Sequence, residues 1–292
     1  MIPVSIITPS LARDFEAARL LCDSMDRYAG GYDRHYVIVA ARDMKLFKPL
    51  AGRRREIVDE RDVLPRGLVT LPFPVRGRTY RWAPGIPPIR GWHVQQLIKF
   101  GMTLRQPNAR VMFVDSDNCF VRPFDLAAFA GGPLVPLQHE PAAITEAGLT
   151  EHALWLRNAH ALLGLASPAM PADDYIGNMI VWDAAIVRDI VARIEAVSQT
   201  SWWRALCRRR EFSEYLIYGA AVASDPELVA RHRPVTQSPS LGYWSGPPLD
   251  EAGLDRLIER LAPQQAAIGV QSFIGTPVGL IRKAALHPRA FA

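Results

Sequence analysis

The feature that most constrains the fold is a buried strand that ends in two carboxylates. Val111 to Val114 are four consecutive apolar residues, and such a run predicts a strand inside a sheet. Asp115 and Asp117 follow, where the strand should leave the sheet. Side chains two apart on extended backbone point to the same side, so the two carboxylates are expected to converge. Paired carboxylates suit a hard divalent cation such as Mg²⁺, which binds through carboxylates together with substrate phosphates.

The position of this pair points to a ligand site at the edge of an α/β sheet. In open α/β folds the ligand lies outside the carboxyl ends of the strands. The chain continues with a second apolar segment, Cys119 to Asp125, before it turns. The alternative is that Asp115, Asp117 and Asn118 only form a turn, because Asp and Asn bond readily to nearby backbone.

Composition favours a globular α/β protein and disfavours several other classes. The 292 residues are 49% apolar, which is enough for one large α/β domain or two small ones. No apolar run reaches the ~20 residues that a membrane span needs, and the first residues resemble a strand rather than a signal peptide, so we expect a cytoplasmic protein. Cys22, Cys119 and Cys207 form no metal or disulfide motif. The net charge of +5 comes without a basic arm, which argues against nucleic-acid binding.

The beginning of the chain follows the strand–helix–strand order of a parallel sheet. Apolar patterns predict strands over 4–8 and 36–40 and a helix over 12–28. Residues 71–90 are rich in proline and glycine, so we expect a loop that either closes over a substrate or covers the sheet. Further patterns predict helices over 91–104, 151–163, 183–197 and 250–261, a helix that begins at Glu211, short strands over 57–58 and 68–70, a strand over 179–182, and a strand and turn over 268–275.

The predicted helix over 91–104 has an unusual polar face. Trp92, Gln96 and Lys99 share this face, which is polar but almost uncharged. A freely solvated helix surface normally carries more charge. A polar helix just before the acidic strand end also resembles the arrangement of GT-A glycosyltransferases, and this resemblance implies that Lys99 contacts a phosphate with Gln96 beside it. On spacing alone, an ordinary surface lysine is the alternative.

The order of strand, Asp-x-Asp pair and second extended segment resembles the D-x-D region of GT-A glycosyltransferases. The pattern is similar to that of an uncharacterised bacterial glycosyltransferase-like family and, distantly, to glycogenin. The resemblance implies a mixed, mainly parallel α/β sheet flanked by helices, with the D-x-D motif at a strand end. It also implies that residues 1–292 form a single domain, with a nucleotide-binding half over 1–125 and an acceptor-binding half over 126–292.

The same resemblance implies a metal cofactor. In GT-A enzymes the acidic pair holds Mn²⁺ or Mg²⁺ against the diphosphate of a sugar nucleotide, which places the metal on Asp115 and Asp117. Glycogenin-like enzymes carry a histidine three residues before the glycine that corresponds to Gly275. Here that position is Ser272, so the third ligand is left open between Gln271 and Ser272.

The resemblance also assigns the remaining site residues. Glu214, near a helix start, is the first candidate for the base that an inverting transferase needs, and Asp174 is the second. The structural alternatives are a helix cap, an Asx turn or an ion pair with nearby arginines. His139 is a possible ligand or substrate contact, whereas His152 and His160 are expected to be surface or packing residues. Contacts to the nucleotide sugar are expected from Thr8, Pro9, Ser10, Gln96, Lys99, Ser116 and Asn178.

A segment with tryptophans and arginines suggests a further contact. Trp at an interface and Arg on phosphates suit an anionic membrane surface, as a lipid-linked acceptor would require. The alternative is a helix that packs its tryptophans inward and leaves its arginines in solvent. The residues concerned are Trp202, Trp203, Arg208, Arg209 and Arg210.

The expected function is metal-dependent transfer of a hexosyl group. The donor would be a nucleotide sugar, first of all a UDP-sugar, and the acceptor a cell-envelope polysaccharide or glycolipid. A nucleotidyltransferase would also use paired Asp and a metal, but the segment Thr8 to Arg13 lacks the glycine typical of its phosphate loop. A protein that binds a nucleotide sugar on the same fold without turnover is the other alternative.

Overall fold

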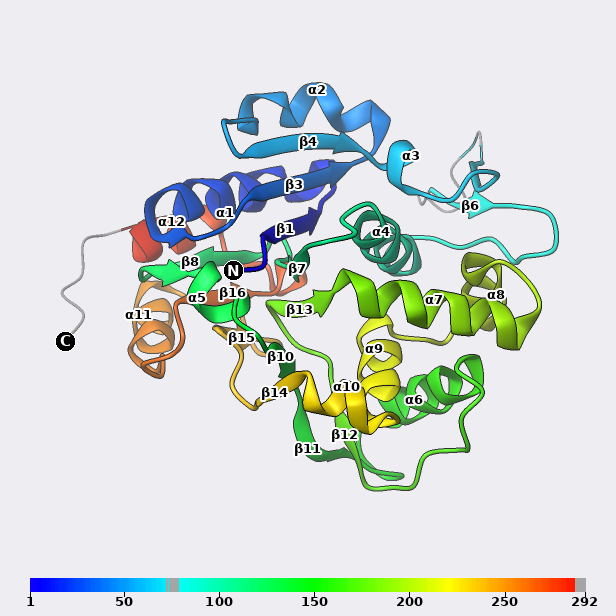
Figure 1. Ribbon diagram of the computed structural model, residues 1–292. Coiled ribbons are helices and arrows are strands. Elements are labelled where there is room, and N and C mark those ends of the chain that lie inside the picture. Colours follow the sequence, from blue (N-terminus) through cyan, green and yellow to red (C-terminus); the bar gives the residue numbers. More distant parts are fainter. Residues whose placement is uncertain (72, 74–78, 287–292) are drawn as a thin grey trace.

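The central sheet has five strands, four of them parallel (Figure 1). The structure is a computed structural model that describes residues 1–71, 73 and 79–286, so part of the predicted 71–90 loop lies outside the described residues. Only one edge strand of this sheet runs antiparallel to its neighbour. This arrangement confirms the mixed, mainly parallel sheet. In spatial order the strands are β13 (Ile180–Asp183), β7 (Arg110–Phe113), β1 (Val4–Pro9), β3 (Arg34–Val39) and β4 (Arg55–Asp59).

The strand order reverses beside β1. After β1 the chain builds β3 and β4 on one side and then returns to place β7 on the other side. Val4 pairs with Arg110 of β7, and Thr8 pairs with Val37 of β3. Such a reversal opens a crevice at the carboxyl ends of the two strands that flank it, and ligands of open α/β sheets bind there. In this protein those ends are Pro9 and the segment that follows Phe113.

Alternating side chains of the central strands enter two different cores. Ile7 and Phe113 pack on the side that holds α4 (Trp92–Leu104), whereas Ile6 and Met112 pack on the side that holds α1 (Phe15–Tyr28). A strand that is buried on both faces reads as a continuous apolar run, which is the pattern over 111–114.

Helices cover both faces of the sheet (Figure 1). On one face α1 packs against α12, and on the other α4 packs against α7 and α9. The bounds are α1 (Phe15–Tyr28), α2 (Met44–Phe47), α3 (Glu60–Val63), α4 (Trp92–Leu104), α5 (Leu126–Ala130), α6 (Thr150–Leu162), α7 (Ala184–Ser198), α8 (Trp202–Arg209), α9 (Glu214–Ala223), α10 (Pro226–Ala230), α11 (Glu251–Glu259) and α12 (Val278–Leu286).

Short strands surround the central sheet. β16 pairs with β15 and β8 beside the C-terminal helix, and β12 pairs with β11. Their bounds, with those of the remaining strands and 3₁₀ helices, are β2 (Ala29–Gly30), β5 (Val69–Thr70), β6 (Arg81–Trp82), β8 (Asn118–Phe120), β9 (Phe124–Asp125), β10 (Val135–Gln138), β11 (Glu140–Ile144), β12 (Ala172–Asp174), β14 (His232–Val235), β15 (Ser240–Tyr243), β16 (Ala267–Val270), η1 (Ala12–Asp14), η2 (Ala41–Asp43), η3 (Lys48–Leu50) and η4 (Ser272–Ile274).

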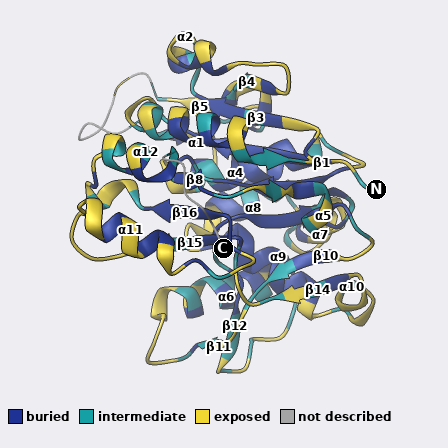
Figure 2. Ribbon diagram, turned by 90° about the vertical axis from the view of Figure 1, so that its left-hand side faces the viewer, coloured by how far each residue is buried: buried dark blue, intermediate teal, exposed yellow. Residues whose placement is uncertain are grey.

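Most predicted helices occur where the apolar spacing placed them. The exception is α9, which begins at Glu214 and not at Glu211, because Ser213 has extended backbone with φ −123° and ψ 131°. Almost every residue of α9 is buried, and the burial map shows it inside the molecule between α6 and the sheet (Figure 2). In the part of the chain that the structure describes, no helix combines the length and apolarity that a bilayer crossing requires.

Candidate functional site

The acidic pair lies in a tight turn at the end of β7. The backbone N–H and the side-chain amide of Asn118 both donate to the carbonyl of Asp115, each at 3.1 Å. Asp115 and Asp117 are therefore not two apart on extended backbone, and the prediction of convergence from a straight strand end is wrong in that detail. The turn that was weighed as an alternative is present, and it carries both carboxylates past the edge of the sheet.

A buried lysine reaches Asp115 from α4. Lys99 Nζ lies 3.7 Å from Asp115 Oδ1, donates to Glu214 Oε1 at 2.9 Å and donates to Tyr215 Oη at 2.7 Å. Burial alone would lower the pKa of Lys99, but the charges of Asp115 and Glu214 raise it well above its ordinary value. Lys99 is thus a fixed cation beside the pair, and the alternative of an ordinary surface lysine is wrong.

Gln96 and Glu214 are placed behind this lysine. The backbone N–H of Glu214, at the start of α9, donates to Gln96 Oε1 at 2.8 Å. Gln96 is completely buried and the Glu214 side chain is 2% exposed. Gln96 Nε2 has no hydrogen-bond partner among the described residues. Gln96 holds the backbone of Glu214, and the carboxylate of Glu214 holds Lys99. Both residues can therefore orient Lys99 without touching a ligand.

The surroundings of Asp117 disfavour its ionised form. Burial, with the charges of Asp115 and Asp14 added to it, raises the pKa of Asp117 to about 7. A divalent cation would relieve this repulsion, so the two carboxylates of the turn fit a metal whose other ligands are phosphate oxygens and water. In the described ranges, no three His, Cys, Asp or Glu side chains gather closely enough to hold a metal by themselves.

A large cavity of about 870 Å³ opens at the carboxyl ends of β1, β3 and β4. Pro9 and Ser10 line it, and Ser10 Oγ is a buried hydroxyl without a partner among the described residues. The N-terminal turn of α4, with Trp92 and Gln95, forms another wall. The charged side chains around it are mostly arginine: Arg13, Arg42, Arg61, Arg81 and Arg90, with Asp43 and Glu60.

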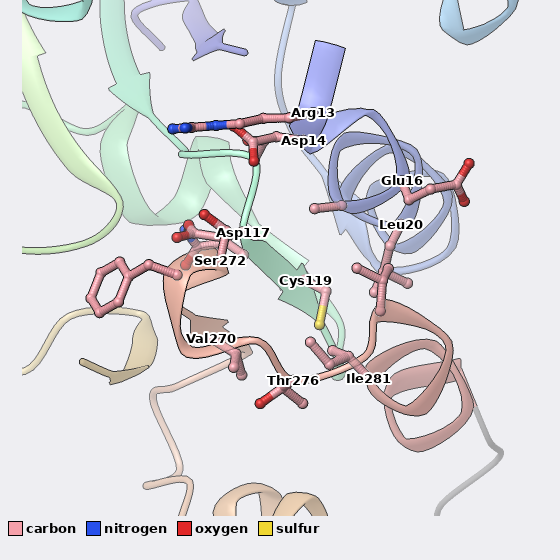
Figure 3. A pocket seen from close by; sticks show the side chains of 15 residues that line it. Arg13, Asp14, Glu16, Leu20, Asp117, Cys119, Val270, Ser272, Thr276 and Ile281 are labelled. Atoms are coloured by element: carbon pink, nitrogen blue, oxygen red, sulfur yellow. The ribbon is translucent and has the colours of Figure 1, made fainter. Parts of the chain in front are cut away.

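A smaller cavity of about 380 Å³ lies between α1 and the C-terminal segment (Figure 3). Asp117 and Ser272 lie beside each other on one wall, and Arg13 and Asp14 lie above them. Leu20, Cys119 and Ile281 form an apolar wall. Arg13, in the 3₁₀ turn that precedes α1, lines both cavities. Ser272, one of the two open third ligands, therefore shares a cavity with Asp117.

Thr8 is used inside the fold. Its hydroxyl donates to the carbonyl of Val114 at 2.7 Å and lies 3.0 Å from His35 Nε2. Arg55 Nε donates to His35 Nδ1 at 3.0 Å, which leaves the Nε2 hydrogen of a neutral imidazole for Thr8. Burial, followed by the charge of Arg55, lowers the pKa of His35 well below its ordinary value. Thr8 thereby holds the residue that precedes Asp115.

The other residues that were expected to contact the nucleotide sugar lie around the acidic turn. Ser116 lines the smaller cavity, and Ser240 Oγ donates to Asn118 Oδ1 at 2.7 Å. Asn178 is 5% exposed, and its side-chain nitrogen has no partner among the described residues. An added Cβ on Gly269 would lie 2.7 Å from that nitrogen and 2.8 Å from Asn118 Oδ1, so the two amides occupy one small space.

The second base candidate, Asp174, is locked by two hydrogen bonds. Its Oδ1 accepts the N–H of Ile176 at 3.0 Å, and its Oδ2 lies 2.7 Å from His152 Nδ1. Asp173 makes a similar contact, with 3.0 Å between its Oδ2 and His139 Nδ1. His152 was expected to be a surface or packing residue, and its partner Asp174 was not predicted from the sequence. The sequence signal that was available is the spacing of His152 and Trp155, which lie one turn apart on α6 and therefore share a face of the helix.

Helix α8 uses its tryptophans and arginines within the fold. Trp203 is 8% exposed, and Trp202 lies 5.6 Å from the ring of Phe100. Arg208 Nε donates to the carbonyl of Gly85 at 3.3 Å; of the neighbouring arginines, Arg209 donates to Asn158 and Arg210 to the carbonyl of Pro88. This is the inward packing that was the alternative to a membrane contact, although the arginines also fasten neighbouring loops.

Comparison with known protein families gives a match over most of the chain. A family model described as "Family of unknown function (DUF6492)" matches residues 1–245. No curated protein matches the chain. The matched region contains Lys99, the acidic turn and Glu214, whereas Ser272 and α12 at the smaller cavity follow it.

Proposed function

We propose a glycosyl transfer function for this chain, which belongs to the family of unknown function DUF6492. The protein is a metal-dependent glycosyltransferase of the GT-A type that moves a sugar from a nucleotide sugar to a cell-envelope polysaccharide or glycolipid. One observation carries the proposal: the turn with Asp115 and Asp117 lies where the strand order reverses, beside the buried cation of Lys99, and its Asp117 lines a cavity.

The proposed donor lies across the carboxyl ends of β1 and β7. The cavity of about 870 Å³ has the size of a small-molecule site and takes the nucleoside, with Pro9 and Ser10 in its wall. Asp115 and Asp117 hold Mn²⁺ or Mg²⁺, with Gln271 or Ser272 as a further oxygen ligand. When bound, the metal neutralises the charge that develops on the leaving diphosphate.

Lys99 supplies a second positive charge to the diphosphate. An ammonium fixed by Glu214 and Tyr215 cannot leave the site, and this preorganisation makes it effective against developing negative charge. We assign Glu214 and Gln96 to the positioning of Lys99, since the carboxylate of Glu214 is buried and occupied. Glu214 is therefore not assigned as the base for the acceptor hydroxyl.

Calorimetric titration with a panel of sugar nucleotides, with and without Mn²⁺, tests the proposal. We expect one nucleotide class to bind in a metal-dependent way, and Asp117→Ala to weaken this binding by about 100-fold or more, since even substitutions beside a metal ligand cost about 10–100-fold. Glu16→Gln is the matched control, because it removes a carboxylate from the wall of the smaller cavity without touching the turn. Absence of binding to every nucleotide under both conditions would overturn the proposal.

Turnover distinguishes the alternatives that share this site. Release of nucleoside diphosphate from a sugar nucleotide identifies a glycosyltransferase, whereas release of pyrophosphate from a nucleoside triphosphate identifies a nucleotidyltransferase. Binding without either product identifies a non-catalytic nucleotide-sugar-binding protein.

A further inference from the structure

The structure contains a histidine–carboxylate dyad that the donor site does not use. His152 on α6 and Asp174 at the end of β12 lie 2.7 Å apart, between Nδ1 and Oδ2. A carboxylate oxygen accepts, so the shared hydrogen belongs to His152 Nδ1, and the neutral ring carries its free lone pair on Nε2. In the described part of the chain Nε2 has no hydrogen-bond partner, and the side chain is 22% exposed. A base oriented by a third group is the arrangement found in activated catalytic histidines.

The dyad is rigid on both sides. The N–H of Ile176 occupies the other oxygen of Asp174, whose side chain is 7% exposed. The imidazole stacks on Trp155 with ring centroids 5.0 Å apart and planes at 22°. The adjacent dyad of His139 and Asp173 differs, because Asp173 is 39% exposed and water can compete for its contacts. Consecutive residues of a strand point to opposite faces, so the two dyads face different surroundings.

A chain of aromatic rings connects the dyad to the large cavity. Trp155 lies 4.7 Å from Trp92, which lines that cavity at the first turn of α4. On the other side, the chain runs only four residues from Asp174 to Asn178, and β13 then pairs with β7 beside the acidic turn. Two ring contacts therefore link His152 to the wall of the large cavity, and its partner Asp174 lies four residues before Asn178.

We propose that His152 is the general base that takes the proton of the acceptor hydroxyl, and that Asp174 positions it. This inference rests on the proposed glycosyl transfer. The acceptor oxygen forms a bond to the anomeric carbon as its proton moves to His152 Nε2. The bond between that carbon and the phosphate oxygen breaks, and its electron pair leaves with the nucleoside diphosphate. Because displacement is direct, the anomeric configuration of the product is inverted.

The pH dependence of the rate is the signature of such a base. Protonation of His152 removes the lone pair, so the rate should fall on the acid side of the profile. Among the described residues, the charged groups close to the dyad include Asp174 itself, Glu140 opposite Asp174 in the β11–β12 pair, and Glu211, which accepts the indole N–H of Trp155 at 3.2 Å. Substitution of His152 should remove the acid limb, whereas loss of a merely structural contact would lower the rate at every pH.

The experiment measures donor binding and turnover separately. The probe is the sugar nucleotide that the calorimetric panel identifies, with water or simple methyl glycosides as acceptors, and release of nucleoside diphosphate is followed against pH. We expect His152→Gln to bind the donor as the unchanged protein does, to lose about 10²–10⁴-fold in kcat and to lose the acid limb. Asp174→Asn should lower kcat with little change in KM for the donor. His160→Gln, on the same helix, and Asp173→Asn, on the same strand, are matched controls that should keep both rate and profile.

Each result has a distinct meaning. Failure of the unchanged protein to bind any donor overturns the glycosyltransferase proposal. Donor binding with a normal rate and acid limb in His152→Gln overturns only the role of His152. Donor binding with no release of nucleoside diphosphate to water or to any glycoside also overturns the dyad as a base, because a competent base activates water as well.

Discussion

Two buried polar clusters flank the same strand end, and they differ in how completely they are satisfied. Beside β3, Thr8, His35 and Arg55 form a closed chain of hydrogen bonds, which ends in a bidentate contact from Arg55 to Asp26 at 2.7 and 3.2 Å. On the other side of β1, Lys99 pairs with Glu214 and lies 3.7 Å from Asp115, and the amide nitrogen of the neighbouring Gln96 has no partner among the described residues.

The difference is the one expected between a structural network and the proposed binding site. Unpaired buried polar groups cost about 1–3 kcal/mol each, so an unpaired amide beside the acidic turn supports the proposal that a ligand binds there. The closed cluster holds the end of β7 through the carbonyl of Val114, and the open cluster presents charge to the crevice. Substitutions in the first should affect stability alone, and substitutions in the second should affect stability and donor binding.

The largest stability effect is expected at Lys99. Lys99→Met leaves Glu214 buried without its cation, and breaking a buried ion pair in this way costs about 3–5 kcal/mol of unfolding free energy. The double variant Lys99→Met/Glu214→Gln removes the stranded charge, so it should recover most of that stability while its donor affinity stays low. Denaturant unfolding together with calorimetry checks both parts. Full donor affinity in a stable double variant would remove Lys99 from the binding site.

A smaller effect is expected at Thr8. Thr8→Val keeps the shape of the side chain but leaves the Val114 carbonyl and His35 without their partner, which costs about 1–3 kcal/mol. Thr8→Ser retains the hydroxyl and is the control. Donor affinity measured well below the unfolding temperature should be unchanged in Thr8→Val. A clear loss of affinity there would restore the sequence-based prediction that Thr8 contacts the nucleoside.

The closed cluster should also make stability depend on pH. His35 stays neutral in the folded protein because its pKa is lowered by burial and by Arg55, whereas an unfolded histidine takes up a proton below about pH 6.5. The unfolded state then binds more protons, so stability falls as the pH falls, by up to about 1.4 kcal/mol per unit from this group. His35→Gln can accept from Arg55 and donate to Thr8 without titrating. The difference between the two unfolding curves from pH 7 to pH 5 measures the effect, and equal slopes would contradict it.

The smallest effect is expected on α8, which belongs to neither cluster. The arginines at its end are exposed and hold loop carbonyls, so replacing Arg208, Arg209 and Arg210 by Ala should cost less than about 1 kcal/mol. Because Trp203 is buried in the core, we also expect sedimentation with anionic vesicles to be the same before and after the replacement. Vesicle binding that disappears with these arginines would support the membrane-surface hypothesis over inward packing.

The sequence by itself determined the parts of the fold that depend on periodicity. The doubly buried strand over 111–114, the opening strand–helix–strand unit and helices such as α7 follow from local apolar spacing, and the structure has them in place. The sequence also located the acidic pair correctly at the end of a central strand. It could not show that Asp115 to Asn118 form a turn, because the dihedral angles there depend on how β8 leaves for a second sheet.

Tertiary structure alone decided which side chains meet. Lys99 and Glu214 are 115 residues apart, and His152 and Asp174 are 22 apart, so no local pattern pairs them. Tertiary contacts decided their chemistry as well: the charges of Asp115 and Glu214 keep Lys99 a fixed cation, whereas burial holds His35 neutral and raises the pKa of Asp117 to about 7. Spacing records the face of an element on which a residue lies. Its partner and the polarity of its surroundings are set by the packing of elements that are distant in sequence.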